Sequence, residues 1–389
     1  MMSEPPSWIG PRPSASQIFA LMVCGVTGLL IPGLQPLLLG ALVNEHRVAT
    51  SDIGAIATAE LLCMGVTAGL AGSFLKAARL KLIALFALAL FATLNIATAF
   101  APSTQILALR AAAGVPSGLL VWLAISLIAR APTPERWAGA YVTAQTLGQL
   151  LVAIVLSTFV MNHSGAAGGF IGLAAICALN MVAVVFLPRQ LEPLPQAATA
   201  GLPNLRGWIA LSVSFFLLAA TSGAWVYLES LSHQAGHPSG IIGQAVSISL
   251  GFQVAGGLAA TVLAGRIPWL FALIACAIVD LAVFALFATS PAPPLFIAAA
   301  AVMGFVWLFA VPFLVPMTID ADPTRRAALL IGGAQLVGGS LGPLFASFFV
   351  TNTDAHGALA FSIGCVAISI AIILGLHVTH GRGQRPQTP

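Results

Sequence analysis

Two charged residues stand inside long apolar stretches of the chain, where ionisable side chains are rare: Glu60 and Arg110. Glu60 lies eight residues into the stretch 52–74, and Arg110 lies five residues into 105–129. At the helical rise these offsets are about 12 Å and about 8 Å, so the two charges are expected at similar depth. Charges inside a membrane usually mark ion or substrate pathways. The pair therefore predicts proton coupling, with Glu60 as the group that takes up and releases a proton.

The same two residues permit a structural interpretation. A fixed ion pair between Glu60 and Arg110 would hold two helices together without any role in transport. Burial favours the neutral form of a carboxyl group, whereas a neighbouring guanidinium favours the charged form. These opposed effects suit a group that must exchange a proton, so coupling is the preferred interpretation and the structural pair stays open.

Glu229 is the third candidate for proton coupling, near the outer end of the stretch 207–232. Thr221 or Ser222, Trp225 and Glu229 are spaced to share one face of a helix. Alternatively, Glu229 extends to the outer lipid headgroups. Asp280, in the middle of 268–289, has no assigned role: a cap on a helix break and an oligomer contact are both open.

Uncharged polar and aromatic side chains supply the candidates for substrate binding. Amides bind solutes in a cavity or bond between helices, and aromatic walls with few polar groups suit an amphipathic ligand, although tryptophan also anchors helices at the membrane interface. The substrate-binding candidates are Gln35, Arg110, Trp122, Tyr141, Gln145, Gln149, Trp225, Trp307 and Gln335.

The elements that must position these residues are twelve apolar stretches. A bilayer core of about 30 Å needs about 20 apolar residues per helix, and nearly every stretch has that length. The chain is 59% hydrophobic and 7% charged, against about 25% charged in soluble domains. The stretches are 17–43, 52–74, 82–100, 105–129, 138–161, 166–187, 207–232, 240–264, 268–289, 295–318, 327–350 and 357–377.

Basic residues set the orientation of these stretches. By the positive-inside rule the side that carries most Lys and Arg is cytoplasmic, which predicts an inner-membrane protein with both termini in the cytoplasm. Because the charges serve topology, the net charge of +4 does not indicate nucleic-acid binding. The basic residues at the termini and in alternate gaps are Arg12, Lys76, Arg79, Lys81, Arg130, Arg136, Arg189, Arg206, Arg266, Arg325, Arg326, Arg382 and Arg385.

A long gap divides the chain into two halves of six stretches each. The predicted domains are 1–187, a cytoplasmic linker at 188–206, and 207–389 with a short cytoplasmic tail. An offset of 190 residues maps Gly114 onto Gly304 and Gln145 onto Gln335. Parallel repeats of this kind are typical of transporters.

On these features the chain resembles the major facilitator superfamily over roughly residues 17–377. ILALRAAAGVPSG (106–118) looks like the motif of the family's fourth segment, and GLAGSFLKAARLK (69–81) stands where its loop signature belongs, without the usual Asp. The Gly-Pro signature of drug/proton antiporters is missing near Gly148. The resemblance implies an all-α membrane protein: twelve transmembrane helices in two pseudo-symmetric six-helix bundles around a midplane cavity.

The predicted function is secondary active, proton-coupled transport of a small amphipathic organic solute, an organic anion or aromatic metabolite, as symport or antiport by alternating access. Proton-driven efflux of drugs or hydrophobic metabolites is the alternative, and a non-transporting receptor or scaffold is more remote. We expect no enzyme activity, because the sequence shows no nucleophile–base cluster. We also expect no metal site and no cofactor, a lipid bilayer as surroundings, and a monomer.

Overall fold

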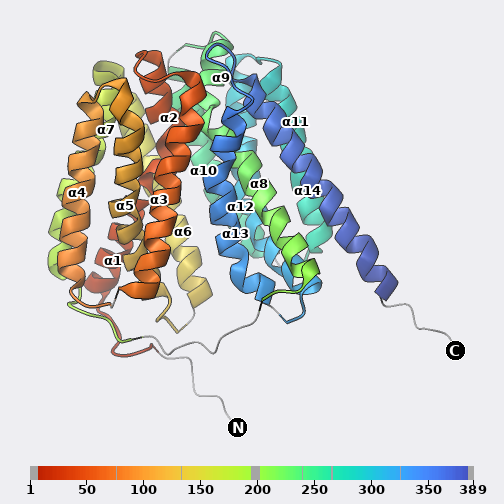
Figure 1. Cartoon of the computed structure of the whole chain (residues 1–389), viewed down its shortest axis with the longest axis horizontal. Coiled ribbons are helices and arrows are strands. Elements are labelled where there is room, and N and C mark those ends of the chain that lie inside the picture. The colour runs from red at the N-terminus through yellow and green to blue at the C-terminus, as the bar shows by residue number, and fades with distance from the viewer. Residues whose placement is uncertain are drawn as a thin grey trace. The chain divides into compact units, whose positions relative to one another are not determined.

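The computed structural model of the chain describes residues 8–75, 77–132, 134–193, 202–238, 240–263, 266–324 and 326–383. Two compact units are present: Met1–Val48 with Ala59–Gln196, and Ala49–Thr58 with Ala197–Pro389. Within each unit the helices run side by side (Figure 1). The middle of the predicted linker 188–206, and the predicted cytoplasmic Lys76, Arg325 and Arg385, lie outside the described residues.

The first unit consists of the N-terminal helices. They are α1 (Ala15–Gly28), α2 (Leu30–Asn44), most of α3 (Ile53–Phe74), α4 (Leu80–Phe100), α5 (Ser103–Ile128), α6 (Pro134–Val155), the π-helical turn η2 (Leu156–Val160), α7 (Met161–Asn180) and the 3-10 helix η3 (Met181–Phe186).

The second unit consists of the C-terminal helices, joined by the short helix η1 and the start of α3. They are η1 (Thr50–Asp52), α8 (Leu205–Val226), α9 (Leu228–Gln234), α10 (Gly240–Leu263), α11 (Trp269–Ala288), α12 (Pro293–Ala321), α13 (Arg326–Ser347) and α14 (His356–Gly383).

Eleven helical stretches of the described chain are long and apolar enough to cross a membrane. One of them, Arg136–Phe186, has 51 residues and covers two of the predicted stretches. It turns at Gly165, whose φ of 56° lies in the left-handed region that glycine enters readily. Large apolar side chains on the outer faces, such as Phe159 and Leu82, are exposed, as lipid-facing residues are. The prediction of an all-α membrane fold is confirmed.

The same helix pairings recur in the two units. In the first unit α5 packs against α1 and α4, and α4 packs against α7. In the second unit α12 packs against α8 and α11, and α11 packs against α14. Gly114 and Gly304, the pair matched by the 190-residue offset, make equivalent contacts. A Cβ on Gly114 would clash with the backbone oxygen of Glu60, and one on Gly304 with that of Ser249.

The predicted helix over 17–43 is broken, with α1 ending at Gly28 and α2 beginning at Leu30. Pro32 explains the break, because its nitrogen cannot donate to Gly28 four residues earlier and its ring crowds that carbonyl. Side chains satisfy the freed oxygens, as the apolar surroundings require. Ser117 Oγ donates to the Gly28 oxygen at 2.6 Å, and Gln149 Nε2 donates to the Leu29 oxygen at 2.6 Å.

The predicted helix over 207–232 is also interrupted, at Tyr227, whose ψ of 5° departs from helical geometry. Glu229 therefore belongs to the short helix α9 rather than to the helix that carries Trp225. The prediction of one continuous helix that carries Thr221, Trp225 and Glu229 is wrong for this reason.

Candidate functional site

Glu60 and Arg110 form a buried ion pair in the first unit. Both guanidinium nitrogens on one edge engage the carboxylate: Nε donates to Oε2 at 3.1 Å, and Nη2 donates to Oε1. Glu60 is 2% exposed and Arg110 is 0% exposed. Two parallel hydrogen bonds of this kind fix both distance and orientation. The expected similar depth of the two charges is thus realised as direct contact.

Other side chains complete the surroundings of Arg110. Nη1 donates to Asn95 Oδ1 at 3.0 Å and to Thr98 Oγ1 at 3.5 Å. The guanidinium carbon lies 5.1 Å from the ring centre of Phe170, a cation–π distance. Helices α3, α4, α5 and α7 therefore meet at one guanidinium, and α5 can approach α3 this closely because Gly114 has no side chain.

The predicted polar stripe of α6 faces the first two helices. Tyr141 is buried, and its hydroxyl lies 2.9 Å from where a Cβ on Gly25 would stand. Gln149 packs on Gly33 and bonds the Leu29 oxygen, so in this structure it joins helices. Gln145 is half-buried.

The remaining amide and aromatic candidates are spread over both units. Gln35, on α2, is buried, and its Nε2 has no hydrogen-bond partner among the described residues. Trp122, on α5, is also buried. Gln335, on α13, is half-buried. Their roles in substrate binding stay predictions.

In the second unit Trp225 and Trp307, two of the predicted substrate-binding residues, pack against each other. The rings of Trp225 and Trp307 stand edge to face, with centres 6.1 Å apart, a favoured aromatic arrangement. Trp307 also lines a cavity of about 20 Å³ together with Thr221 of α8 and Asp280 of α11. Glu229, on α9, is 7% exposed, which opposes its interpretation as a headgroup-facing side chain.

The amino-acid sequence of the chain matches the model of a known protein family. A family model described as the Major Facilitator Superfamily matches residues 16–343. The chain belongs to the major facilitator superfamily. It is therefore a multi-pass membrane transporter and not an enzyme, as predicted. No curated protein matches the chain.

Solved facilitator structures share the fold. A bacterial homologue of the human lysosomal transporter Spinster, in an inward-facing and unoccupied conformation, is 11% identical with a TM-score of 0.69, and the match covers 95% of this chain and 98% of that one. The nucleoside transporter NupG is 14% identical with a TM-score of 0.69, and the match covers 94% and 99%. At such identities the likeness shows the fold alone.

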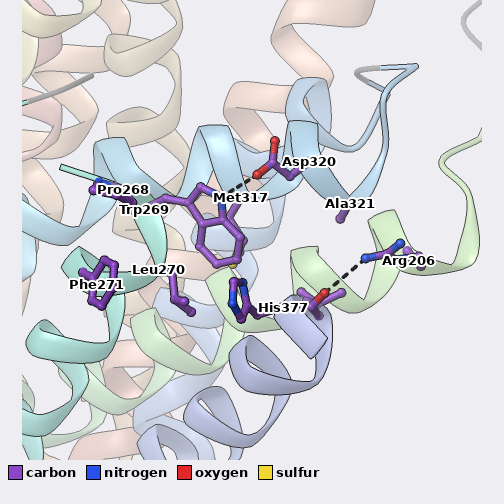
Figure 2. Close-up of a pocket in the computed structure, with 10 residues that line it drawn as sticks. Arg206, Pro268, Trp269, Leu270, Phe271, Met317, Asp320, Ala321 and His377 are labelled. Atoms are coloured by element: carbon purple, nitrogen blue, oxygen red, sulfur yellow. Dashed lines mark hydrogen bonds between the residues drawn. The ribbon is translucent and has the colours of Figure 1, made fainter. Parts of the chain in front are cut away.

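A larger pocket of this facilitator chain, about 260 Å³, lies near the helix ends of the second unit (Figure 2). Trp269 Nε1 donates to Asp320 Oδ2 at 2.6 Å, and Arg206 Nη2 donates to the Leu376 oxygen at 3.2 Å. His377 projects between them in Figure 2. The tryptophan at a helix start is typical of interfacial anchoring. None of the predicted transport residues lines this pocket.

Three neighbours of Arg110, namely Asn95, Thr98 and Phe170, are not among the site residues predicted from the sequence. Asn95 was visible as an isolated amide within an apolar stretch, and Thr98 follows it three residues later, which places both on one helical face. That spacing is a signal for a polar contact. Phe170 carries no such signal, because phenylalanine is abundant in every apolar stretch of this chain.

Proposed function

We propose that the protein is a proton-coupled secondary transporter of a small amphipathic organic anion across the inner membrane. The observation that carries this proposal is the buried Glu60–Arg110 pair. It contains one group that changes charge on protonation and one that keeps its positive charge. Such a pair allows Arg110 to exchange the carboxylate of Glu60 for a carboxylate of the solute.

The exchange follows from charge balance. When a proton neutralises Glu60, Arg110 is left with an uncompensated charge in an apolar interior, which is strongly unfavourable. A carboxylate on the transported solute would restore the balance by accepting the guanidinium hydrogen bonds that Glu60 releases. Proton and anion would then be bound together and released together, which is symport.

In the present arrangement Arg110 has no exposed surface. Solute entry therefore requires a second conformation in which α3 and α5 separate at the pair. Breaking the Glu60–Arg110 bonds by protonation would favour that conformation, while Asn95 and Thr98 keep the guanidinium in place. This supplies the two states that alternating access needs.

Proton-driven efflux of hydrophobic compounds is the second candidate. The specific observation in its favour is the edge-to-face pair of Trp225 and Trp307. Aromatic surfaces bind amphipathic compounds irrespective of a carboxylate. Under this alternative Glu60 would still exchange the proton, but Arg110 would make no contact with solute.

Transport by purified protein in liposomes tests the proposal. With labelled benzoate and indole-3-acetate as probes, a pH gradient that is acid outside and alkaline inside should drive accumulation by the wild type beyond that of protein-free liposomes. Glu60→Gln should abolish this uphill accumulation and spare exchange of labelled for unlabelled anion. Glu192→Gln, which alters an exposed carboxylate of the same unit, should behave as wild type.

The outcomes separate the candidates. Accumulation by Glu60→Gln equal to wild type would remove Glu60 from coupling. Gradient-driven movement of ethidium without movement of either anion would favour efflux. A reporter fused after His163 should read periplasmic and one after Gln196 cytoplasmic; the reverse would overturn the proposed orientation.

A further inference from the structure

Asp280 is a buried carboxyl group of the second unit that the proposed mechanism does not use. It stands about 17 Å from the start of α11 and about 12 Å from its end, at 1.5 Å per residue, near the middle of a membrane-spanning helix. The residue is 5% exposed. Its Oδ1 is buried and has no hydrogen-bond partner among the described residues.

The side chain borders the cavity between α8, α11 and α12. Thr221, Cys276, Trp307 and Asp280 contribute to its wall, and aliphatic side chains of α8 and α12 form the rest. Its volume of about 20 Å³ is enough for one water molecule, which needs about 10–15 Å³. An organic solute is too large for it.

No described side chain offers Asp280 a counter-charge. Neither α8 nor α12 brings a titratable group to the cavity wall, and Cys276 is the other titratable group there. Helix α14, which also packs on α11, carries Cys365 within its length and His356 and His377 towards its ends. An ionised carboxylate without a cation is very costly in such a place.

The ligands in the cavity wall favour a proton over a metal cation as the ion that Asp280 binds. Hard metal cations take six or more oxygen ligands, whereas this wall supplies the Asp280 carboxyl group and the Thr221 hydroxyl, which itself donates to the Leu217 oxygen at 2.9 Å. A proton needs a single carboxyl oxygen and, for its transfer, one adjacent water. The cavity supplies the carboxyl oxygen and has room for one water molecule.

We propose that Asp280 is a second proton-binding site, loaded through a water molecule in the cavity between α8, α11 and α12. The inference extends the proposed proton coupling by placing a carrier in each unit: Glu60 exchanges its proton against Arg110, and Asp280 exchanges its proton with the cavity water. Proton binding by Asp280 stands independently of which solute is carried.

Infrared spectroscopy of the purified protein in lipid tests this directly. A protonated carboxyl group shows a carbonyl band that moves to lower frequency in D₂O. This band should be present in the wild type and in Glu60→Gln, should disappear on raising the pH, and should be missing from Asp280→Asn. A spectrum of Asp280→Asn identical to that of the wild type at every pH would overturn the proposal.

A second measurement needs no variant. Dicyclohexylcarbodiimide adds to protonated carboxyl groups in apolar surroundings, and mass spectrometry locates the adduct. Asp280 should be labelled, less so at high pH. Asp320, an exposed carboxylate of α12 that accepts a hydrogen bond from Trp269, is the matched control and should stay unlabelled. Labelling of Asp280 that does not fall as the pH is raised would contradict the site.

The two proposals fail in different ways. If Glu60→Gln still accumulates anions under a pH gradient while Asp280 shows its band and its label, the proposed role of Glu60 is wrong and the Asp280 site stands. If Asp280 shows neither band nor label while Glu60→Gln loses accumulation, the second site is wrong and the proposed function stands.

Discussion

The two units bury carboxyl groups in opposite ways. In the first unit Glu60 is bonded on both oxygens by Arg110. The 190-residue offset maps these two residues onto Leu250 and Ala300, which are both fully buried in the second unit. The contacts of the matched glycines place Ser249 opposite Gly304 where Glu60 stands opposite Gly114, so the second unit has the buried, uncharged Ser249, Leu250 and Ala300 at the place of the ion pair. Its own buried carboxyl group, Asp280, stands elsewhere, and its Oδ1 has no hydrogen-bond partner among the described residues.

This difference shows that the ion pair is not required by the packing. The close approach of α5 to α3 at Gly114 is matched by that of α12 to α10 at Gly304, where the uncharged Ser249 takes the position of Glu60. Buried ion pairs add little stability compared with apolar residues of similar volume. A pair that is present in one unit and absent from the matched positions of the other supports the proposed role in coupling.

The largest expected effect comes from unpairing the charges of the first unit. Arg110→Met leaves Glu60 buried without a cation and should lower the free energy of unfolding by about 3–5 kcal/mol. The double variant Glu60→Leu with Arg110→Met gives the first unit an uncharged filling like that of the second and should regain most of this loss. Thermal unfolding in detergent measures both.

Loss of transport in the double variant would accompany recovered stability if the pair serves coupling. A double variant as unstable as Arg110→Met would contradict the equivalence of the two units at this place. A double variant that is stable and still accumulates anions under a pH gradient would show that the pair is structural.

A smaller effect is expected at the matched glycines. Gly114→Ala and Gly304→Ala each place a methyl group against a backbone oxygen of the facing helix. Since backbone cannot turn aside as a flexible side chain does, the helices must separate, and each change should destabilise by about 1–3 kcal/mol. Gly339→Ala, where a Cβ meets nothing within 4 Å, is the control. Unequal losses at Gly114 and Gly304 would limit the similarity of the two units.

The sequence predicted the membrane fold and the depth of the charged pair, because both depend on helix length and a fixed rise per residue. It did not predict Thr98 or Phe170 as neighbours of Arg110, since this depends on how α4 and α7 are rotated about their axes. Pro32 was visible as a cause of helix loosening, but the partners of the freed carbonyls, Ser117 and Gln149, come from helices far away in sequence. Rotation and partner choice are set by tertiary packing.

The smallest effect on stability is expected for the substitution Asp280→Asn, in contrast to the substitutions at the Glu60–Arg110 pair. Glu60 makes a bidentate pair, so removing its partner leaves a buried charge uncompensated. Asp280 Oδ1, by contrast, has no hydrogen-bond partner to lose within the described part of the chain. If Asp280 is neutral in its cavity, Asp280→Asn exchanges one uncharged polar group for another of the same shape. Below the pKa of an ordinary aspartate, about 3.9, the free energy of unfolding should then stay within about 1 kcal/mol of the wild type, and above it Asp280→Asn should become more stable than the wild type. The sign follows from linkage: a neutral carboxyl group in the cavity ionises when the wild-type chain unfolds, so raising the pH favours the unfolded wild type and leaves the asparagine variant unaffected. A loss as large as that of Arg110→Met would mean that Asp280 is ionised and paired, and the contrast between the two units would disappear.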